Sequence, residues 1–444
     1  MKPGSTSMRA AYAASLSMLL VCMSVFAVNM ALPAIAANLG GDVTSQQWLI
    51  SGYTLPFAAL LIASGEVSDR FGAKRTLALA SLAYGIASAI CPFAQTIEML
   101  IALQAVLGSI GAFVLPSSMS LIGEAYQEGT QRAHALMLWG IGGSSASAIG
   151  PLTGGAVVQL HWGLAFAINV PFCITIALLC ANVANNPKSR KGTSFDALGL
   201  MLGTAGLASF VAGIISLSNS DSSVMPTVLC LSGVALLLLF ALQERKSKHP
   251  VLPTTLFTSK ETRLALLSGF AMIFAWNGSV FACTLLLQGN LGFSPLENAL
   301  AFAPAAITCM LGNLVGERLA KTHRVSFVLV CGGVVLLLGY FTLALCSHCL
   351  SPAIIAVAIS LAGMGGAIVT PVLAALVLTH NGGSESGAAS AAFNAMRQVG
   401  GTIGVAVYGA CLSLASFFEN GFLAAAAISA LMLTAMLVGF IRIR

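Results

Sequence analysis

The chain is short of charged residues, and this scarcity excludes most classes of soluble protein. Only 8% of its 444 residues are Asp, Glu, Lys or Arg, while 57% are apolar, and soluble domains carry about a quarter charged residues. The mean hydropathy of +0.93 agrees with this composition. So few charges cannot cover a water-facing surface, and the composition therefore predicts a protein immersed in a lipid bilayer.

Long polar stretches are also lacking, which leaves no room for a separate soluble domain. Fourteen apolar segments recur from end to end, with about 32 residues for each, against about 20 that a helix needs to cross a hydrocarbon core. The first segment is too long for the apolar region of a signal peptide, so we expect it to be retained as the first helix. The expected spans are residues 11–34, 46–65, 76–94, 98–122, 133–157, 164–184, 197–218, 226–243, 264–288, 296–316, 325–346, 352–379, 387–413 and 420–441.

Basic residues are missing from every second connection between these segments. With the amino end inside, the inner connections hold nineteen of the twenty Lys and Arg residues, and the twentieth, Arg397, falls inside a predicted span. Cytoplasmic loops of membrane proteins collect Lys and Arg. The distribution predicts an even number of spans with both termini in the cytoplasm. The net charge of +6 follows from these basic inner connections, which we expect to contact anionic lipids. We therefore infer no nucleic-acid partner from this charge.

Clusters of catalytic or metal-binding side chains are lacking too. The six His residues are scattered, no ATP-binding motif is visible, and most of the eleven Cys residues lie in predicted spans as small apolar packing residues. Cys346 and Cys349 flank His348 at the end of a span and could form a disulfide or half of a metal site, but one pair supplies too few ligands for a closed site. We therefore predict no enzyme, no cofactor and no metal site.

Two polar, basic connections divide the spans into six, a middle pair and a second six. We expect an amino-terminal six-helix bundle over residues 1–184, a linker with two extra helices over 185–262 and a carboxy-terminal six-helix bundle over 263–444. The connection GEVSDRFGAKR after the second span has a weaker counterpart after the tenth, GNLVGERLAKTHR at residues 312–324. The chain is thus predicted to contain two related halves, an arrangement suited to alternating access.

The connection GEVSDRFGAKR is the most specific motif in the sequence. Its glycines permit a tight reversal, and its acidic residue can accept hydrogen bonds from arginines or a helix amino end. The motif resembles the signature loop of the major facilitator superfamily. That resemblance implies the all-α major facilitator fold and a loop that latches two halves in one conformation; the alternative is an ordinary basic inner loop. The matching residues are Gly65, Asp69, Arg70, Gly72, Lys74 and Arg75.

Further motifs are similar to those of one branch of this superfamily, the fourteen-spanner drug:proton antiporters. They are NMALPAIA at residues 29–36, TSQQWLISGYTL at 44–55, LLLQGNLGFSPLENALAFAP at 285–304 and SGAASAAFNAMRQVGGTIGVAV at 386–407. The fifth span carries GPLTGG, an element associated with export in this superfamily. Glycine and proline allow a helix to kink and a neighbour to approach closely. The predicted hinge residues are Gly150, Pro151, Gly154 and Gly155.

Two positions depart from this branch. The resemblance implies an Asp in the first span, where this chain has Ser24, and an Arg in the fourth span, where it has Gln104. Those charged positions are the ones that the resemblance assigns to proton relay. Proton coupling is expected from the resemblance, while its carrier in this chain is unassigned.

Polar and aromatic side chains inside the spans are the candidates for binding a substrate. Arg397 stands about ten residues into the thirteenth span and could bind an anionic substrate or lock a helix interface. An apolar, aromatic cavity with few charges favours amphipathic or hydrophobic compounds over sugars. The predicted substrate-binding residues are Asn29, Tyr53, Gln104, Trp276, Asn277 and Arg397.

These observations predict a secondary transporter in the cytoplasmic (inner) membrane that exports hydrophobic or amphipathic small molecules, such as drugs, antimicrobials, toxins or secondary metabolites. Its two six-helix halves are expected to rock around the substrate, with protons as the coupling ion and membrane lipids as neighbours. A second interpretation is a facilitator or importer of a small metabolite that needs no internal carboxylate. A membrane-embedded enzyme or a sensor is disfavoured because no cluster of His, Asp, Glu or Ser is visible.

Overall fold

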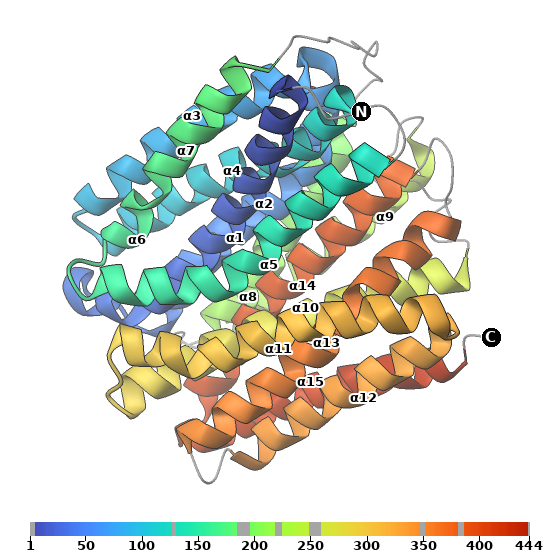
Figure 1. Ribbon diagram of the computed structural model, residues 1–444. Coiled ribbons are helices and arrows are strands. Elements are labelled where there is room, and N and C mark those ends of the chain that lie inside the picture. Colours follow the sequence, from blue (N-terminus) through green and yellow to red (C-terminus); the bar gives the residue numbers. More distant parts are fainter. Residues whose placement is uncertain are drawn as a thin grey trace. The chain divides into compact units, whose positions relative to one another are not determined.

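The computed structural model of the chain is all-helical over the residues that it describes (Figure 1). These residues are 5–126, 130–183, 196–217, 224–247, 259–346, 351–380 and 386–442. Every expected apolar segment coincides with a helix or a pair of consecutive helices. In chain order the α-helices are α1 (Ser5–Leu39), α2 (Val43–Phe71), α3 (Ala73–Ile90), α4 (Ile97–Ala125), α5 (Thr130–Val158), α6 (Leu164–Ala167), α7 (Asn169–Ala181), α8 (Ala197–Ser216), α9 (Val224–Lys246), α10 (Lys260–Thr284), α11 (Pro295–Thr322), α12 (Val325–Cys346), α13 (Pro352–His380), α14 (Ser386–Leu414) and α15 (Phe418–Ile441).

Eleven helical segments within the described ranges are long and apolar enough to cross a membrane. A crossing needs about 20 residues in a helix. Helices α2, α5 and α14 are not among the eleven, although each has 29 residues and so has sufficient length. The predicted multi-pass membrane protein is confirmed, and the count of fourteen spans stays a prediction.

Three of the predicted spans change their helical geometry, and in the first of them α3 is followed directly by a 3₁₀ helix, Cys91–Phe93. Ile168 separates α6 from α7, and Pro171, the third residue of α7, accounts for the break because its ring clashes with the carbonyl four residues earlier, that of Ala167, where α6 ends. Helix α10 continues into a π-helix, Leu285–Asn290. Proline thus explains the break in the sixth predicted span, whereas no feature of the sequence predicted the π-helix.

Side chains cap several helix amino ends, as the unpaired backbone N–H groups there require. Thr96 accepts a hydrogen bond from the N–H of Met99 at the start of α4. Ser294 and Glu297 form a reciprocal capping box at the start of α11. Asp196 accepts from the N–H of Gly199 at the start of α8, and this bond holds the pKa of its carboxyl below the ordinary value.

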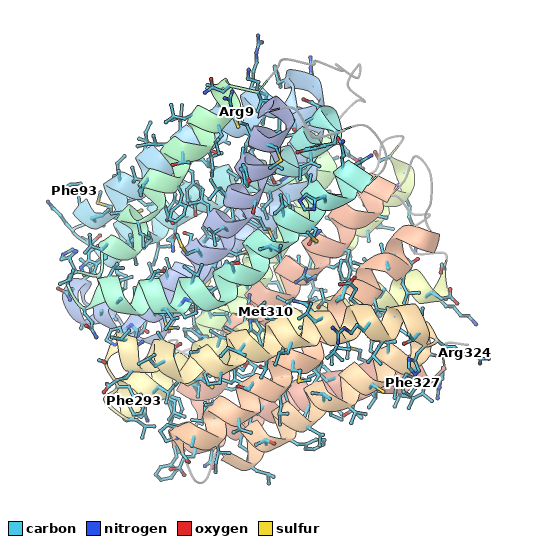
Figure 2. The ribbon with its side chains drawn as sticks, in the orientation of Figure 1. Arg9, Phe93, Phe293, Met310, Arg324 and Phe327 are labelled. Carbon is cyan, nitrogen blue, oxygen red and sulfur yellow. The ribbon has the colours of Figure 1, made fainter. Side chains whose placement is uncertain are left out.

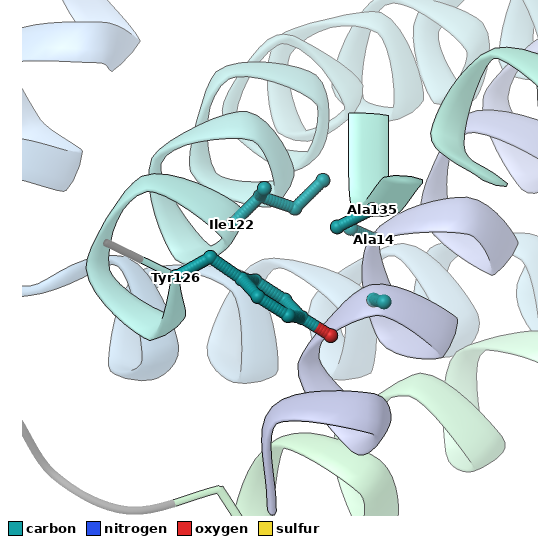
Figure 3. Packing of buried hydrophobic residues seen from close by; sticks show 5 residues of the cluster. Ala14, Ile122, Tyr126 and Ala135 are labelled. Carbon is teal, nitrogen blue, oxygen red and sulfur yellow. The ribbon is translucent and has the colours of Figure 1, made fainter. Parts of the chain in front are cut away.

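The helices pack into two compact units, and the first is built mainly from the amino-terminal half. It comprises Met1–Gly41, Pro56–Phe195 and Ser294–Ala299. Within it, α1 packs against α4, α5 and α7, and α3 packs against α4 and α7. One of its buried clusters joins α1, α4 and α5 and includes the ring of Tyr126 (Figure 3). The buried members of this cluster are Ala11, Ala14, Ile122, Tyr126 and Ala135.

The second unit holds the carboxy-terminal half together with the middle helix pair. It comprises Asp42–Leu55, Asp196–Phe293 and Leu300–Arg444. Helix α10 is packed by α13, α14 and α15, while α8 packs against α9 and α14. The middle pair therefore belongs by packing to this unit. The predicted domain boundaries at 184/185 and 262/263 stay predictions, and the connection 185–195 lies outside the described residues.

Large apolar side chains cover the outside of many helices. Phe93 is 76% exposed and projects from the edge of the molecule in Figure 2, and Met310 is 63% exposed. Helix α9 presents exposed apolar residues along its length. In water such surfaces would drive aggregation, whereas hydrocarbon chains cover them without cost. This distribution is what a lipid environment requires.

Candidate functional site

The signature loop is a one-residue reversal between two helices. Helix α2 continues to Phe71 and α3 begins at Ala73, so only Gly72 separates them. Gly72 has φ +90°, a backbone conformation that glycine adopts without steric cost. The motif GEVSDRFGAKR, predicted as a loop, is thus mostly the last turns of one helix and the first turn of the next.

The amino end of α3 is held by an acidic residue that the sequence did not single out. The backbone N–H of Ala73 donates to Glu124 Oε1 at 3.2 Å. Glu124 lies in the last turn of α4. A carboxylate at a helix amino end interacts favourably with the helix dipole. No local signal marked Glu124, because its partner lies 51 residues away in the sequence.

Two basic side chains hold the carboxyl end of α7. Lys74 Nζ donates to the carbonyl of Val183 at 2.6 Å, and Arg9 Nη1 donates to the carbonyl of Asn182 at 3.4 Å. Cations at a helix carboxyl end satisfy unpaired carbonyl groups and oppose the helix dipole. Lys74 of the predicted latch therefore has a partner within the first unit.

The other predicted latch residues make fewer described contacts. Arg70 and Arg75 are exposed, and Gly65 is partly buried. The side chain of Asp69 lies outside the described residues, as do Cys349, His348 and the side chain of Cys346. A latch between two halves of the protein stays a prediction.

The glycines of the fifth span form a seam with α1. A β-carbon at Gly150 would lie 2.8 Å from Phe26 Cβ, and one at Gly154 would lie 2.6 Å from the Ala27 Cα. Real β-carbons do not approach other atoms so closely, so only glycine permits this spacing of α1 and α5. Pro151 lies inside α5 between the two glycines. The seam provides the close helix approach that the motif predicted, and its use as a hinge stays a prediction.

Gly155 faces a different neighbour. A β-carbon there would lie 2.6 Å from the carbonyl oxygen of Pro295 and 2.8 Å from Ala299 Cβ. Both residues belong to the first turns of α11, which pack within the first unit. The GPLTGG element therefore contacts α1 through Gly150 and Gly154 and α11 through Gly155.

Ser24, the residue at the position of the missing first-span carboxylate, is the centre of a buried hydrogen-bond cluster. Tyr84 Oη of α3 donates to Ser24 Oγ at 2.9 Å, and Asn169 Nδ2 of α7 donates to the same oxygen at 3.2 Å. All three residues are buried. The cluster ties three helices together with neutral groups, and the sequence identified only Ser24 as a position of interest.

The predicted substrate-binding residues fall into two classes by exposure. Asn29, Tyr53 and Gln104 are buried, and Asn29 Nδ2 donates to the Val25 carbonyl of its own helix. Trp276 and Asn277 are partly exposed, although most of α10 around them is buried. Together with Ile273 they form a partly exposed stripe at helical spacing. Asn277 lies against Gly401 of α14 and the Trp276 ring lies against Gly363 of α13, and a role of these residues in substrate binding stays a prediction.

Arg397 lies on α14 beside α10 and is partly exposed. Its guanidinium carbon is 5.7 Å from the centroid of the Phe393 ring, and Nη1 donates to Asn394 Oδ1 at 3.5 Å. A β-carbon at Gly269 of α10 would lie 3.2 Å from Arg397 Cγ. The structure thus fixes the stem of Arg397 by packing and supports its charged end by an aromatic face and an amide.

Sequence comparison places the chain among known transporters. The profile of the Major Facilitator Superfamily matches residues 14–405 and, in a second match, residues 265–442. The multidrug efflux pump LfrA of Mycolicibacterium smegmatis is 28% identical over 396 residues, covering 89% of this chain and 79% of that protein. The methylenomycin A resistance protein of Bacillus subtilis is 31% identical over 417 residues, covering 92% of this chain and 88% of that protein.

Comparison with solved structures shows the same fold. The crystal structure of a D-xylose-proton symporter matches with a TM-score of 0.71, covering 99% of this chain and 98% of that chain. The two sequences are 12% identical. At this identity the likeness concerns the fold and carries no information about the substrate.

Proposed function

The chain belongs to the major facilitator superfamily, and from this membership we propose that it is a secondary active transporter that exports hydrophobic or amphipathic small molecules by alternating access. The observation that carries the proposal is similarity over about nine-tenths of the chain to proteins named for multidrug efflux and methylenomycin resistance. The apolar and aromatic character of α10 around Trp276 supports a weakly polar substrate.

The proposed topology has fourteen spans with both termini in the cytoplasm, as in the fourteen-spanner drug:proton antiporters. Eleven apolar segments of sufficient length support it, as do the 29-residue helices α2, α5 and α14. The segregation of nineteen of twenty basic residues onto one side supports the orientation. In this topology the connection between α2 and α3 faces the cytoplasm.

Protons are the proposed coupling ion, carried by a group other than a first-span carboxylate. Ser24 is neutral and engaged by two donors. Among the described side chains the only buried carboxylate is that of Glu244, in the last turn of α9. An uncoupler of the proton gradient is expected to abolish export if this part of the proposal holds.

A second candidate is a facilitator that needs no coupling ion. The neutral, buried side chains of Ser24 and Gln104 favour it, because they replace the charged relay of the antiporter branch. Accumulation distinguishes the two candidates. A coupled exporter lowers cell-associated substrate below the equilibrium level, whereas a facilitator only speeds equilibration.

The proposed function is tested by growth of deletion and overexpression strains on a chemically broad panel of toxic compounds. We expect overexpression to raise, and deletion to lower, tolerance to a subset of hydrophobic or amphipathic compounds. Sugars and other densely polar compounds serve as the control class. Equal growth of all strains on every compound, together with no transport by reconstituted protein, would contradict export.

Asp69→Asn is expected to reduce export while leaving the amount of protein in the membrane unchanged. An ionised acceptor forms stronger hydrogen bonds than an amide, and its loss costs about 1.5–3 kcal/mol, or roughly tenfold or more in rate if the bond stabilises one transport conformation. Efflux of a fluorescent substrate measures the effect. Asp69→Glu is the matched control and should retain most of the activity; full efflux by Asp69→Asn would remove the latch role.

A further inference from the structure

A four-residue sequence occurs once in each compact unit. SVFA stands at residues 24–27 in α1 and again at residues 279–282 in α10. Helix α1 is the first helix of the predicted amino-terminal bundle, and α10 is the first helix of the predicted carboxy-terminal bundle. The repeat therefore places a serine, Ser24 or Ser279, at a corresponding point of the first helix in each predicted half.

Each of these serines meets a buried tyrosine from a later helix of the same unit. Tyr84 Oη of α3 donates to Ser24 Oγ at 2.9 Å, and Tyr340 Oη of α12 lies 3.3 Å from Ser279 Oγ. The tyrosine follows the serine by 60 residues in the first pair and by 61 in the second. A leucine and a small residue precede both tyrosines, as LAY in the first pair and LGY in the second. The same contact is thus built twice from matching sequence.

The direction of the second hydrogen bond follows from the other bond of Ser279. Ser279 Oγ donates to the carbonyl of Trp276 at 2.9 Å. A serine hydroxyl has one proton to donate and accepts through its lone pairs. Because that proton points at the Trp276 carbonyl, the hydroxyl of Tyr340 is the donor toward Ser279. The tyrosine is therefore the donor in both units.

Both pairs are enclosed by protein. Tyr84 and Tyr340 are fully buried, and Ser24 and Ser279 are buried as well. When a buried donor loses its acceptor, water does not replace the lost partner, so the cost of removing the donor from water remains. Each hydrogen bond therefore specifies which side of the first helix faces the tyrosine.

A hydrogen bond of this kind can set the rotation of a membrane helix about its own axis. The hydrophobic effect orients an amphipathic helix in water, but it does not act between helices in lipid. Polar side chains that meet across two membrane helices supply the missing specificity. Because Ser279 must face Tyr340 of α12, the direction of the neighbouring side chains on α10 is fixed with it.

Trp276 is the side chain most directly affected by this contact on α10. It precedes Ser279 by three residues, close to one helical turn, and its carbonyl accepts the Ser279 proton. Its partly exposed ring lies 3.4 Å from the position of a β-carbon at Gly363 of α13. A rotation of α10 would move this ring along α13 and change the surface that it presents to a ligand.

We propose that Tyr84 and Tyr340 are equivalent positioning residues, each of which fixes the rotation of the first helix of its predicted half through a serine. Tyr340 in this way orients Trp276 toward a hydrophobic or amphipathic substrate. The proposal rests on the proposed function and on the predicted substrate-binding role of Trp276. Both tyrosines are fully buried, so their hydroxyls act on affinity through the helix and not by contact with the substrate.

The first test compares two buried tyrosines whose hydroxyls bind different helices. Tyr340→Phe removes one oxygen and should raise the KM for a hydrophobic substrate roughly threefold to tenfold, the effect of one buried hydrogen bond, with turnover nearly unchanged. Tyr408→Phe is the matched control and should keep the unsubstituted KM, because the Tyr408 hydroxyl is bound to Ser429 of α15 at 2.7 Å. An unchanged KM in Tyr340→Phe, or equal losses in both variants, would overturn the positioning role.

Double variants test whether each tyrosine acts through its serine. Ser279→Ala leaves the Tyr340 hydroxyl buried without its acceptor and should raise KM at least as much as Tyr340→Phe does. Adding Tyr340→Phe to Ser279→Ala removes the orphaned donor, so no further loss is expected. A product of the two single effects would overturn action through the serine.

The equivalence of the two tyrosines is tested by the corresponding change in the first unit. Tyr84→Phe should raise KM by a factor similar to that of Tyr340→Phe. In the variant that combines them the two factors should multiply, because the two pairs share no residue. An unchanged KM in Tyr84→Phe would overturn the equivalence.

The fluorescence of Trp276 tests the positioning role without any transport. In protein whose only tryptophan is Trp276, Tyr340→Phe should shift the emission maximum and change quenching by acrylamide, whereas Tyr408→Phe should do neither. A changed signal in protein that moves no compound would uphold the positioning role and refute the exporter. An unchanged signal would overturn the positioning role whatever the transport result. The background protein carries Phe in place of the other three tryptophans, Trp48, Trp139 and Trp162.

Discussion

Replacing Gly154 by Leu is expected to prevent α1 and α5 from packing and to remove folded transporter from the membrane. The new β-carbon would lie 2.6 Å from the Ala27 Cα, which is backbone and cannot turn aside as a side-chain tip can. Overpacking of a well-packed interior costs about 1–3 kcal/mol, and here the two helices must also separate. We therefore expect a loss of at least about 3 kcal/mol in stability and no measurable export.

The yield of monodisperse protein and its thermal unfolding midpoint in detergent measure this effect. Gly140→Leu in the same helix is the control, because no atom of a neighbouring helix lies within 4 Å of a β-carbon at that position. The two variants add the same side chain to one helix, so their difference isolates the seam. A folded, active Gly154→Leu protein would show that α1 and α5 are not held at this spacing in the membrane.

Arg397→Ala is expected to weaken transport of anionic substrates while leaving neutral ones nearly unaffected. Hydrogen bonds to charged groups contribute about 1.5–3 kcal/mol, so KM for an anionic compound should rise roughly tenfold or more. The guanidinium contacts the Phe393 ring and Asn394 Oδ1. Arg397→Lys keeps the charge and should recover part of the affinity.

The comparison of an anionic with a neutral compound separates binding from structure. If Arg397 only locks α14 against α10, both compounds will lose transport together and the protein will unfold at a lower temperature. If the kinetics of both compounds match the unsubstituted protein, Arg397 has neither role. A selective loss for the anionic compound is the outcome that the proposed binding role requires.

The helices could be predicted well because the bilayer imposes their length and composition. Apolar runs such as residues 325–346 and 420–441 predicted α12 and α15 to within two residues at each end. Errors arose where charge was taken as the end of a helix. Helix α2 continues through Glu66, Asp69 and Arg70 to Phe71, since a helix that reaches the membrane surface can carry charges on its last turns.

The contacts between helices could not be predicted in the same way. In a soluble helix the polar face identifies the side that meets water, but lipid-facing and core-facing sides of a membrane helix are both apolar. The sequence therefore identified Ser24 and not its partners Tyr84 and Asn169, and Lys74 and not the carbonyl that it binds. Glycine motifs were the exception, because they marked where helices approach closely.

The contact between the first turns of α2 and α14, in which Gln47 Nε2 donates to the Ala406 carbonyl at 3.3 Å, has a consequence for biosynthesis. The hydrogen bond of Gln47 cannot form until Ala406 has been synthesised, 359 residues later. At a synthesis rate of about 5–20 residues per second this delay is roughly 20–70 s. During that time the first turns of α2 lack their partner on α14, so the packing of this part of the protein is completed only after α14 has been synthesised.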